Sequence, residues 1–155
     1  MAYAISELPL GPGWIGIAPM PGRAGAYQAD LNAILQWGAG MVLTMTTVQE
    51  LAGDLGADLE AAGVLWRHLP VGDFGAPSDE VAALWPGVSS EALEILSSGG
   101  KVLAHCYGGC GRSGMALLRL MVDTGEAPET ALARLRSVRP CAVETGAQFD
   151  WAAGQ

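Results

Sequence analysis

The stretch from residue 101 to residue 122 constrains the fold of this chain more than any other part of its sequence. Residues 101–104 form a short apolar run that is typical of a buried strand, and residues 115–122 have the composition of a buried helix. Between them lies the run 105–114, which reads His-Cys-Tyr-Gly-Gly-Cys-Gly-Arg-Ser-Gly. A strand, a glycine-rich turn and a helix in this order are the usual way to build a phosphate cradle. The stretch therefore predicts an anion-binding loop between two buried elements.

The rest of the chain alternates between strand and helix patterns. Apolar runs predict strands at residues 14–18, 41–45 and 64–69. Helical spacing and end signals predict helices at residues 27–37, 54–62, 80–97, 128–137 and 144–151. Pro86 and Gly87 are expected to interrupt the third of these, and Thr47 and Glu50 resemble a capping box that opens a short helix. The alternation predicts an α/β fold: a single three-layer domain over residues 1–155, with a central, mostly parallel sheet flanked by helices.

The spacing of Cys106 and Arg112 suits the binding of a phosphoryl group. Five residues separate them, and three of these are glycine. Such a backbone can curl tightly and aim its N–H groups at one point, where an oxyanion fits. Arg112 adds a planar guanidinium that can grip two phosphate oxygens at once. We therefore expect the loop to bind a phosphoryl group rather than a lone carboxylate.

The same positive field acts on the sulfur of Cys106. A thiol beside a helix N-terminus and a cation loses its proton more readily than a free thiol, so we expect a thiolate near neutral pH. A thiolate beneath a bound phosphate can attack phosphorus in line and form a phosphocysteine intermediate. Ser113 is expected to donate a hydrogen bond to the sulfur when it leaves in the second step. His105 is expected to fix the loop or tune the thiolate through a backbone hydrogen bond.

This run of residues resembles the signature loop of a known enzyme family. His105-Cys106, the five-residue loop, Arg112-Ser113 and Gly114 are similar to the signature of the cysteine-dependent protein tyrosine phosphatases, in their small dual-specificity branch. Residues 20–23, Met-Pro-Gly-Arg, are similar to the N-terminal region of kinase-associated phosphatases. The resemblance implies that Cys106 is the nucleophile and Arg112 a phosphate ligand. It also implies a cradle of backbone amides from Tyr107, Gly108, Gly109, Cys110, Gly111 and Arg112.

A phosphatase of this kind needs a general acid near the leaving oxygen, and Asp73 is the candidate. It lies in the glycine- and proline-rich segment 69–77, directly after a predicted strand, so we expect it on a loop at the strand end. The small phosphatases carry their acid on a similar loop at a comparable distance before the cysteine. Asp79 and Glu80 instead fit the first turn of a helix. The alternative for Asp73 is a turn-forming residue between glycines.

The segment 139–148 resembles a C-terminal stretch of the same phosphatase branch. A glutamine there orients the water that hydrolyses the phosphocysteine, so the resemblance implies this role for Gln148. The alternative is an exposed helical glutamine without a function in the site. Glu144, in the same segment, is a candidate for orienting the guanidinium of Arg112.

Charge and hydropathy limit the partners that the chain can bind. Its net charge is −8 and its pI is near 4.5, which leaves no basic footprint for nucleic acid or anionic lipid. No lysine lies between Cys106 and Arg112, unlike in phosphatases that resemble the tumour-suppressor lipid phosphatase. No apolar stretch approaches ~18 uncharged residues, so no membrane span is expected. We predict a phosphorylated protein or peptide as substrate, with no metal and no cofactor.

The three cysteines form an odd set without a regular framework, which suits a reducing compartment. Because the N-terminus also lacks a basic region followed by a long apolar core, we predict a cytoplasmic protein. Cys110 lies inside the signature loop and has two interpretations. It is either a small loop residue or a resolving partner that forms a disulfide with an oxidised Cys106. Cys141 is an alternative partner.

Two other functions fit parts of the same loop. A phosphate-binding module without catalysis needs the cradle, but it needs neither a proton donor at Asp73 nor help from Ser113. A thiol redox or arsenate-reducing enzyme shares the loop, but such enzymes generally carry it near the N-terminus, and here it lies two-thirds along the chain. The sequence therefore favours hydrolysis of phosphotyrosine, with phosphoserine and phosphothreonine as further candidate substrates.

Overall fold

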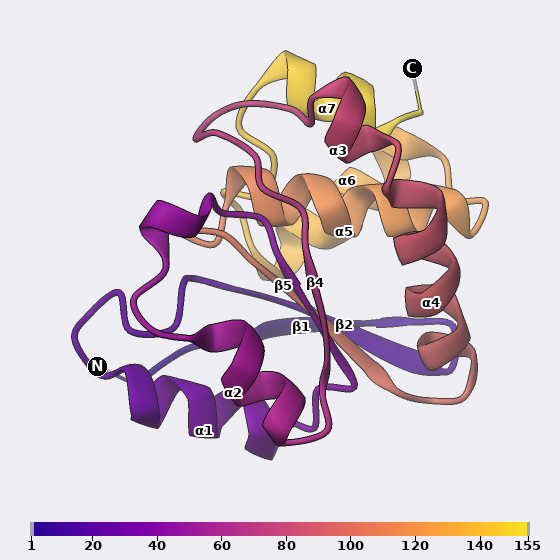
Figure 1. Cartoon of the computed structure of the whole chain (residues 1–155). Helices are drawn as coiled ribbons and strands as arrows, with labels where there is room; N and C mark the ends of the chain where they lie inside the picture. Colours follow the sequence, from indigo (N-terminus) through magenta and orange to yellow (C-terminus); the bar gives the residue numbers. More distant parts are fainter. Residues whose placement is uncertain (1, 155) are drawn as a thin grey trace.

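Figure 1 shows the computed structural model, which describes residues 2–154 as one five-stranded sheet with helices on both faces. The strands are β1 (Ser6–Leu10), β2 (Gly13–Ala18), β3 (Met41–Thr44), β4 (Leu65–His68) and β5 (Lys101–His105). Their order across the sheet is β1-β2-β5-β3-β4, with only β1 antiparallel to its neighbour among these strands. The predicted α/β fold with a mostly parallel sheet is confirmed.

Helices divide between the two faces of the sheet (Figure 1). On one face lie α1 (Tyr27–Trp37) and α2 (Leu55–Ala61), which pack on inward-facing strand residues such as Val42 and Leu103. The other face carries α3 (Asp79–Ala82), α4 (Trp85–Ser97), α5 (Gly111–Asp123), α6 (Pro128–Val138) and α7 (Gly146–Ala152). Among residues 2–154, no helix combines the length and the apolar character that a membrane span requires.

The parallel strands all end at the same edge of the sheet. Ala18 at the end of β2 and Thr44 at the end of β3 both pair in register with His105 at the end of β5. The loops that follow β2, β3, β4 and β5 therefore meet at this carboxyl edge, where α/β folds bind their ligands. The signature loop follows β5, and the 3₁₀ turn η1 (Val48–Glu50) follows β3. The fold thus brings four separate chain segments to one place.

The first strand, β1, was not expected from the sequence. Only Leu8 and Leu10 of this strand are buried, in alternation with exposed residues, and Pro9 interrupts the apolar pattern. A proline is tolerated here because β1 is an edge strand that pairs on one side only. Residues 6–10 form a strand because they pair with β2, and their own sequence pattern gives little sign of it.

The helix predicted over residues 80–97 is two helices, α3 and α4. The break falls at Ala83 and Leu84 rather than at Pro86 and Gly87. Pro86 lies in the first turn of α4, where its missing N–H group has no intrahelical partner to lose. The predicted interruption near Pro86 is therefore confirmed, and the proline itself opens the second helix.

Candidate active site

Cys106 lies at the base of a small cavity at the carboxyl edge of the sheet. It directly follows β5, its side chain is 3% exposed, and it is the one free cysteine among residues 2–154. The cavity has a volume of about 150 Å³ and is lined by Asp73, Phe74, Cys106, Tyr107, Gly108, Cys110 and Glu144. A larger cavity of about 470 Å³ lies between the β1–β2 turn and α4, far from this thiol in the fold. The cavity over Cys106 is therefore the candidate active site.

The loop that follows Cys106 presents backbone donors without partners. Within the described range 2–154, the N–H groups of residues 107–112 have no hydrogen-bond acceptor. The loop carbonyls are held on the outside, because Arg139 donates from Nε to Gly109 O at 2.8 Å and from Nη2 to Gly108 O at 2.9 Å. Gly109 has a φ of 74°, and a Cβ there would lie 2.6 Å from the backbone of Ala18. Free amides with outward carbonyls are the arrangement that binds an oxyanion.

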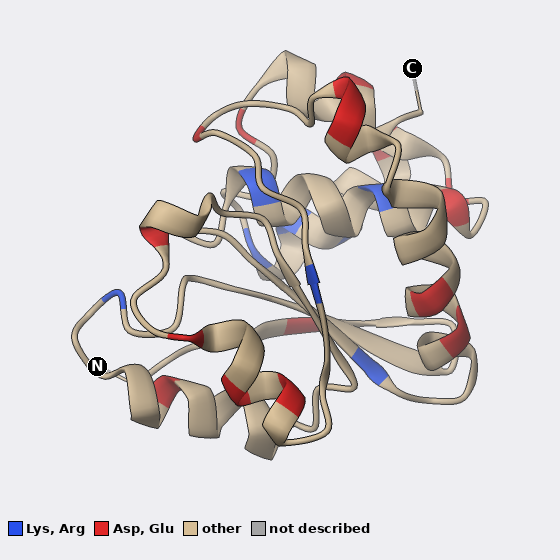
Figure 2. Cartoon of the chain, viewed as in Figure 1, with Lys and Arg blue, Asp and Glu red and all other residues tan. Residues whose placement is uncertain are grey.

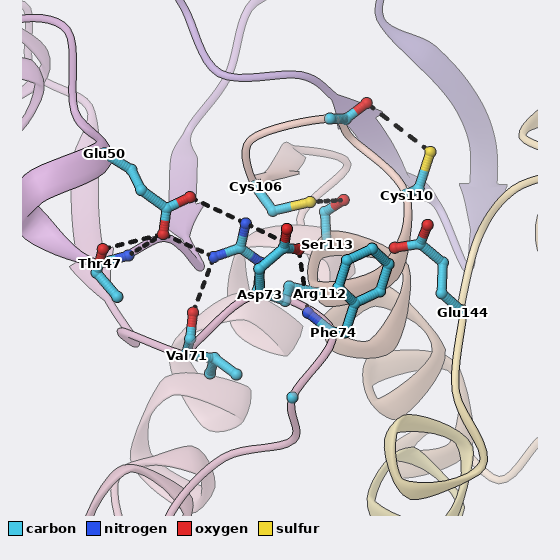
Figure 3. A network of polar contacts seen from close by, with 12 residues as sticks. Thr47, Glu50, Val71, Asp73, Phe74, Cys106, Cys110, Arg112, Ser113 and Glu144 are labelled. Atoms are coloured by element: carbon cyan, nitrogen blue, oxygen red, sulfur yellow. Dashed lines mark hydrogen bonds and ion pairs between the residues drawn. The ribbon is translucent and has the colours of Figure 1, made fainter.

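Arg112 is held by two segments that lie far from it in the sequence. Its Nη1 and Nη2 donate to the two carboxylate oxygens of Glu50 at 2.9 and 3.0 Å, and Nη1 also donates to Val71 O at 2.8 Å (Figure 3). Although Arg112 is only 2% exposed, its Nε has no partner among residues 2–154. A buried N–H group without a partner is rare, and it leaves one guanidinium donor for a ligand oxygen.

Glu50 performs the role that the sequence suggested for Glu144. The backbone N of Thr47 donates to Glu50 Oε1 at 3.1 Å and its Oγ1 does so at 2.9 Å, so the predicted capping box is present. The hydrogen bonds from Arg112 lower the pKa of Glu50 to about 2, against the opposing effect of its partial burial. Glu50 is therefore ionised and fixed before any ligand arrives. The capping box was the only signal in the sequence that this carboxylate would be oriented.

Ser113 contacts the sulfur of Cys106, and His105 contacts its carbonyl. Ser113 Oγ lies 3.2 Å from Cys106 Sγ, and both groups are buried. His105 Nδ1 lies 3.2 Å from Cys106 O, and its Nε2 lies 2.7 Å from the hydroxyl of Thr44. Because a carbonyl only accepts, Nδ1 carries the ring proton and Nε2 accepts from Thr44, whose oxygen accepts in turn from Trp66 Nε1 at 2.8 Å.

Burial keeps the imidazole of His105 neutral. Its pKa is lowered from 6.5 to about 4, chiefly because the charged form would be desolvated. The neutral ring in one tautomer ties the start of the loop to β3 through Thr44. This geometry agrees with the expectation that His105 fixes the loop by a backbone hydrogen bond.

Asp73 lies on the loop that follows β4, at the rim of the cavity over Cys106. Its side chain is 62% exposed, and Oδ1 lies 3.4 Å from Nη2 of Arg112. The same oxygen accepts a hydrogen bond from the backbone N of Phe74 at 3.0 Å. Phe74 has a φ of 62°, a left-handed conformation that non-glycine residues rarely adopt and that clusters at functional sites. The predicted acid and the predicted nucleophile thus face one cavity.

Gln148 is buried and fully engaged rather than exposed. Its Oε1 accepts from the backbone N of Glu144 at 2.8 Å and from that of Thr145 at 3.2 Å. Its Nε2 donates to Gly75 O at 3.1 Å, which joins the C-terminal segment to the Asp73 loop. Gln148 does not line the cavity over Cys106. Its predicted contact with the hydrolytic water stays a prediction, whereas its contacts position two loops.

Cys110 is bonded to Cys141 and not to Cys106. The disulfide joins Cα atoms that are 5.1 Å apart, across 31 residues of sequence. Of the interpretations that the sequence left open, a resolving role for Cys110 toward an oxidised Cys106 is not available in this structure, because Cys106 is a free thiol and Cys110 is already bonded to Cys141. The disulfide weakens the argument from the cysteines for a reducing compartment. It ties the signature loop to the segment between α6 and α7.

Comparisons with known proteins agree with this geometry. A family model described as "Polymorphic toxin system, DSP-PTPase phosphatase" matches residues 16–126. Cyclin-dependent kinase inhibitor 3 of Mus musculus is 34% identical over 91 residues, which are 57% of this chain and 42% of that protein. The Homo sapiens protein of that name is 33% identical over 95 residues, or 59% of this chain and 43% of the other. The match thus spans less than half the length of these curated relatives.

Solved structures of phosphatases share the fold over nearly the whole chain. The structure of Tk-PTP in its active form is 31% identical, with a TM-score of 0.73, and the alignment covers 88% of this chain and 86% of that one. Kinase-associated phosphatase, with its catalytic-site cysteine replaced by serine, has a TM-score of 0.84 at 24% identity, covering 98% of this chain and 93% of the other. At that lower identity the likeness shows the fold alone.

Proposed function

We infer the function of this chain from its family: it belongs to the DSP-PTPase phosphatases of polymorphic toxin systems, whose family model matches most of its length. We propose that residues 1–155 act as one catalytic domain that hydrolyses phosphotyrosine in proteins, and phosphoserine and phosphothreonine as well. The observation that carries the proposal is a buried free thiol, Cys106, beneath the amides of residues 107–112 and the Nε of Arg112, none of which has an acceptor within residues 2–154.

In the first step the phosphoryl oxygens occupy the cradle of loop amides and accept from Nε of Arg112. The thiolate of Cys106 attacks phosphorus in line, so a P–S bond forms while the ester P–O bond breaks. The electron pair of that bond passes to the leaving oxygen, which takes a proton from Asp73. The exposed loop position of Asp73 allows it to reach a leaving group above the cavity.

In the second step a water molecule attacks the phosphocysteine and releases inorganic phosphate. A P–O bond forms, the P–S bond breaks and the electron pair returns to the sulfur of Cys106, while the Asp73 carboxylate left by the first step takes the proton that the water loses. Ser113 Oγ, 3.2 Å from that sulfur, donates a hydrogen bond to the departing thiolate. His105 positions the nucleophile through its bond to the Cys106 carbonyl. Neither step needs a metal ion.

The surface favours a protein or peptide substrate with a single phosphate. Figure 2 shows acidic residues on α2, α3 and α4, in keeping with the net charge of −8, which opposes binding to nucleic acid or anionic membranes. Phe74 and Tyr107 are both well exposed at the rim of the cavity, where they can pack against the ring of a phosphotyrosine. The absence of lysine between Cys106 and Arg112 argues against a lipid phosphate.

The phosphate-binding module and the thiol redox enzyme each leave some residues of the site without a role. A binding module has no use for an acid at the rim or for a hydroxyl on the sulfur, and both Asp73 and Ser113 stand in those places. A thiol redox enzyme that resolves its own nucleophile needs a second free thiol beside it, whereas Cys110 is bonded to Cys141. A cytoplasmic location remains a prediction, and the disulfide removes its cysteine argument because disulfides persist in oxidising compartments.

The test is turnover of para-nitrophenyl phosphate and of phosphotyrosine, phosphoserine and phosphothreonine peptides, with a chelator present. We expect activity in the chelator, none in Cys106→Ser, and a rate lower by ~10² to 10⁴ in Asp73→Asn for the peptides. The same assay with phosphoinositides tests for a lipid phosphatase, and an assay of arsenate reduction tests for the redox enzyme. Undiminished turnover by Cys106→Ser would refute the mechanism.

A further inference from the structure

Glu144 is the one carboxylate at the cavity that the mechanism has not used. It lies in the loop before α7 and lines the same cavity as Cys106 and Asp73. Figure 3 shows its carboxylate turned toward the side of the site where Phe74 lies. Within residues 2–154, that carboxylate has no hydrogen bond and no ion pair, so it is free to accept from a water molecule.

The backbone holds Glu144 in this position. Its N–H group donates to Gln148 Oε1 at 2.8 Å, and the preceding Val143 donates from its N to Cys110 O at 3.3 Å. Val143 has a φ of 65°, so the turn that aims Glu144 is strained, and such strain is retained mainly at functional sites. A Cβ on Gly111 would collide with Glu144 Oε1, so only glycine lets the carboxylate lie against the first turn of α5.

Most other polar side chains near the cavity already have hydrogen-bond partners. Gln148 uses its oxygen for two backbone amides and its nitrogen for Gly75 O. Ser113 contacts the sulfur of Cys106, and Asp73 is bound to Arg112 and to the backbone of its own loop. Within residues 2–154, both carboxylate oxygens of Glu144 are without partners, whereas Asp73 has only Oδ2 free.

We propose that Glu144 positions the water that hydrolyses the phosphocysteine. Its carboxylate accepts one hydrogen bond from that water, while Asp73, which has given its proton to the leaving group, accepts the proton that the water releases. The P–O bond then forms, the P–S bond breaks, and the electron pair returns to Cys106. A cavity of about 150 Å³ has room for a phosphoryl group and for one water, whose share of liquid volume is about 30 Å³. The inference rests on the proposed phosphatase function.

The role needs an acceptor but not a negative charge. A carboxylate beside a phosphoryl dianion repels it, which weakens substrate binding. A glutamine at position 144 keeps an acceptor oxygen and removes this repulsion. We therefore expect Glu144→Gln to hydrolyse the intermediate at least as fast as the natural protein and to have a lower KM.

The test is rapid-quench kinetics with a ³²P-labelled phosphotyrosine peptide, which separates formation of the phosphoenzyme from its hydrolysis. In Glu144→Ala we expect unchanged formation and hydrolysis slower by ~10-fold, the effect of one lost hydrogen bond to the attacking water, so labelled enzyme accumulates. Glu144→Gln should show no accumulation. Glu129→Ala, an exposed carboxylate on α6, is the matched control and should behave like the natural protein.

The outcomes distinguish this inference from the function on which it rests. If the natural protein neither turns over the peptide nor becomes labelled, the proposed function fails. If it does both and Glu144→Ala hydrolyses its phosphoenzyme at the natural rate, the inference about Glu144 is overturned. Glu144→Gln as slow as Glu144→Ala would also overturn it, because the carboxylate would then act as the proton acceptor.

Discussion

The signature loop is supported on two sides by quite different means. On one side, the Arg112 flank (Thr47, Glu50 and the Val71 carbonyl) holds the guanidinium by hydrogen bonds and an ion pair. On the other, the C-terminal flank (Arg139 and Cys141) holds the loop backbone by two hydrogen bonds to carbonyls and one disulfide. The Arg112 flank therefore positions the guanidinium, whereas the C-terminal flank maintains the conformation of the loop backbone. Substitutions in the first should mainly lower kcat/KM, and substitutions in the second should mainly lower the free energy of unfolding.

The largest expected effect comes from the guanidinium that the Arg112 flank holds. In Arg112→Lys a single ammonium replaces the planar fork, so it cannot bond both oxygens of Glu50 and also reach a phosphate oxygen. We expect kcat/KM to fall by ~10² to 10³, as when one donor to the transition state is lost. Steady-state kinetics measure this, and thermal unfolding checks the fold. A fall of less than tenfold in a folded variant would contradict the assignment.

The disulfide of the C-terminal flank should affect stability more than catalysis. Breaking the Cys110–Cys141 bond frees a loop of 31 residues in the unfolded chain. In Cys141→Ser we expect the free energy of unfolding to fall by about 3 to 4 kcal/mol. Urea denaturation measures it, and Cys110→Ser/Cys141→Ser should match the single variant. If kcat/KM instead fell as far as in Arg112→Lys, the division between the flanks would be wrong.

His105 supports the base of the loop and belongs to neither flank. Its contribution can be recognised by the pH dependence of the free energy of unfolding. The unfolded chain protonates this histidine below pH 6.5, whereas the folded chain does so only near pH 4. The free energy of unfolding should therefore fall as the pH drops from 6.5 toward 4, by up to about 3 kcal/mol. The part of the slope between pH 6.5 and 5 lies above the range in which Glu50, with its pKa of about 2, adds to it. Urea denaturation across this range measures the slope.

The chain has one other histidine, His68, which provides the control. The His68→Gln variant should keep the pH slope, whereas His105→Gln should lose it, whatever its stability at pH 7. A slope that follows His68 instead would show that His105 does not stay neutral in the folded protein.

The smallest expected effect is that of Glu50→Gln, because the amide oxygen can still accept from Arg112. Losing the charge weakens the fork, and we expect kcat/KM to fall about tenfold. Because the pKa of Glu50 is lowered to about 2, the difference from the natural protein should persist at every assay pH above about 4. If kcat/KM fell as much in Cys141→Ser as in Glu50→Gln, the two flanks would not differ in function as proposed.

The sequence predicted those site residues that belong to a short, continuous sequence motif or directly follow a recognisable strand. Cys106, Arg112 and Ser113 belong to a single loop whose glycines dictate its path, and Asp73 follows a strand that the apolar pattern reveals. Their placement at one sheet edge follows from the parallel strands. These parts of the site are therefore local in sequence or fixed by the fold class.

The supports of the loop could not be predicted, because each depends on a tertiary contact. Glu50 meets Arg112 across 62 residues. Three cysteines allow three pairings, and only the tertiary path of the chain brings Cys110 and Cys141 together. Glu144 and Gln148 lie four residues apart, yet only the chain path shows which of them faces the cavity.

The central claim is that Cys106 carries the phosphoryl group covalently. The most direct test is to quench the reaction with a phosphotyrosine peptide in acid within milliseconds and to locate the phosphoryl group by peptide mass spectrometry. We expect it on Cys106, with none on the protein in Cys106→Ser. Turnover with no phosphocysteine at any time, or a phosphoryl group on another residue, would contradict the account.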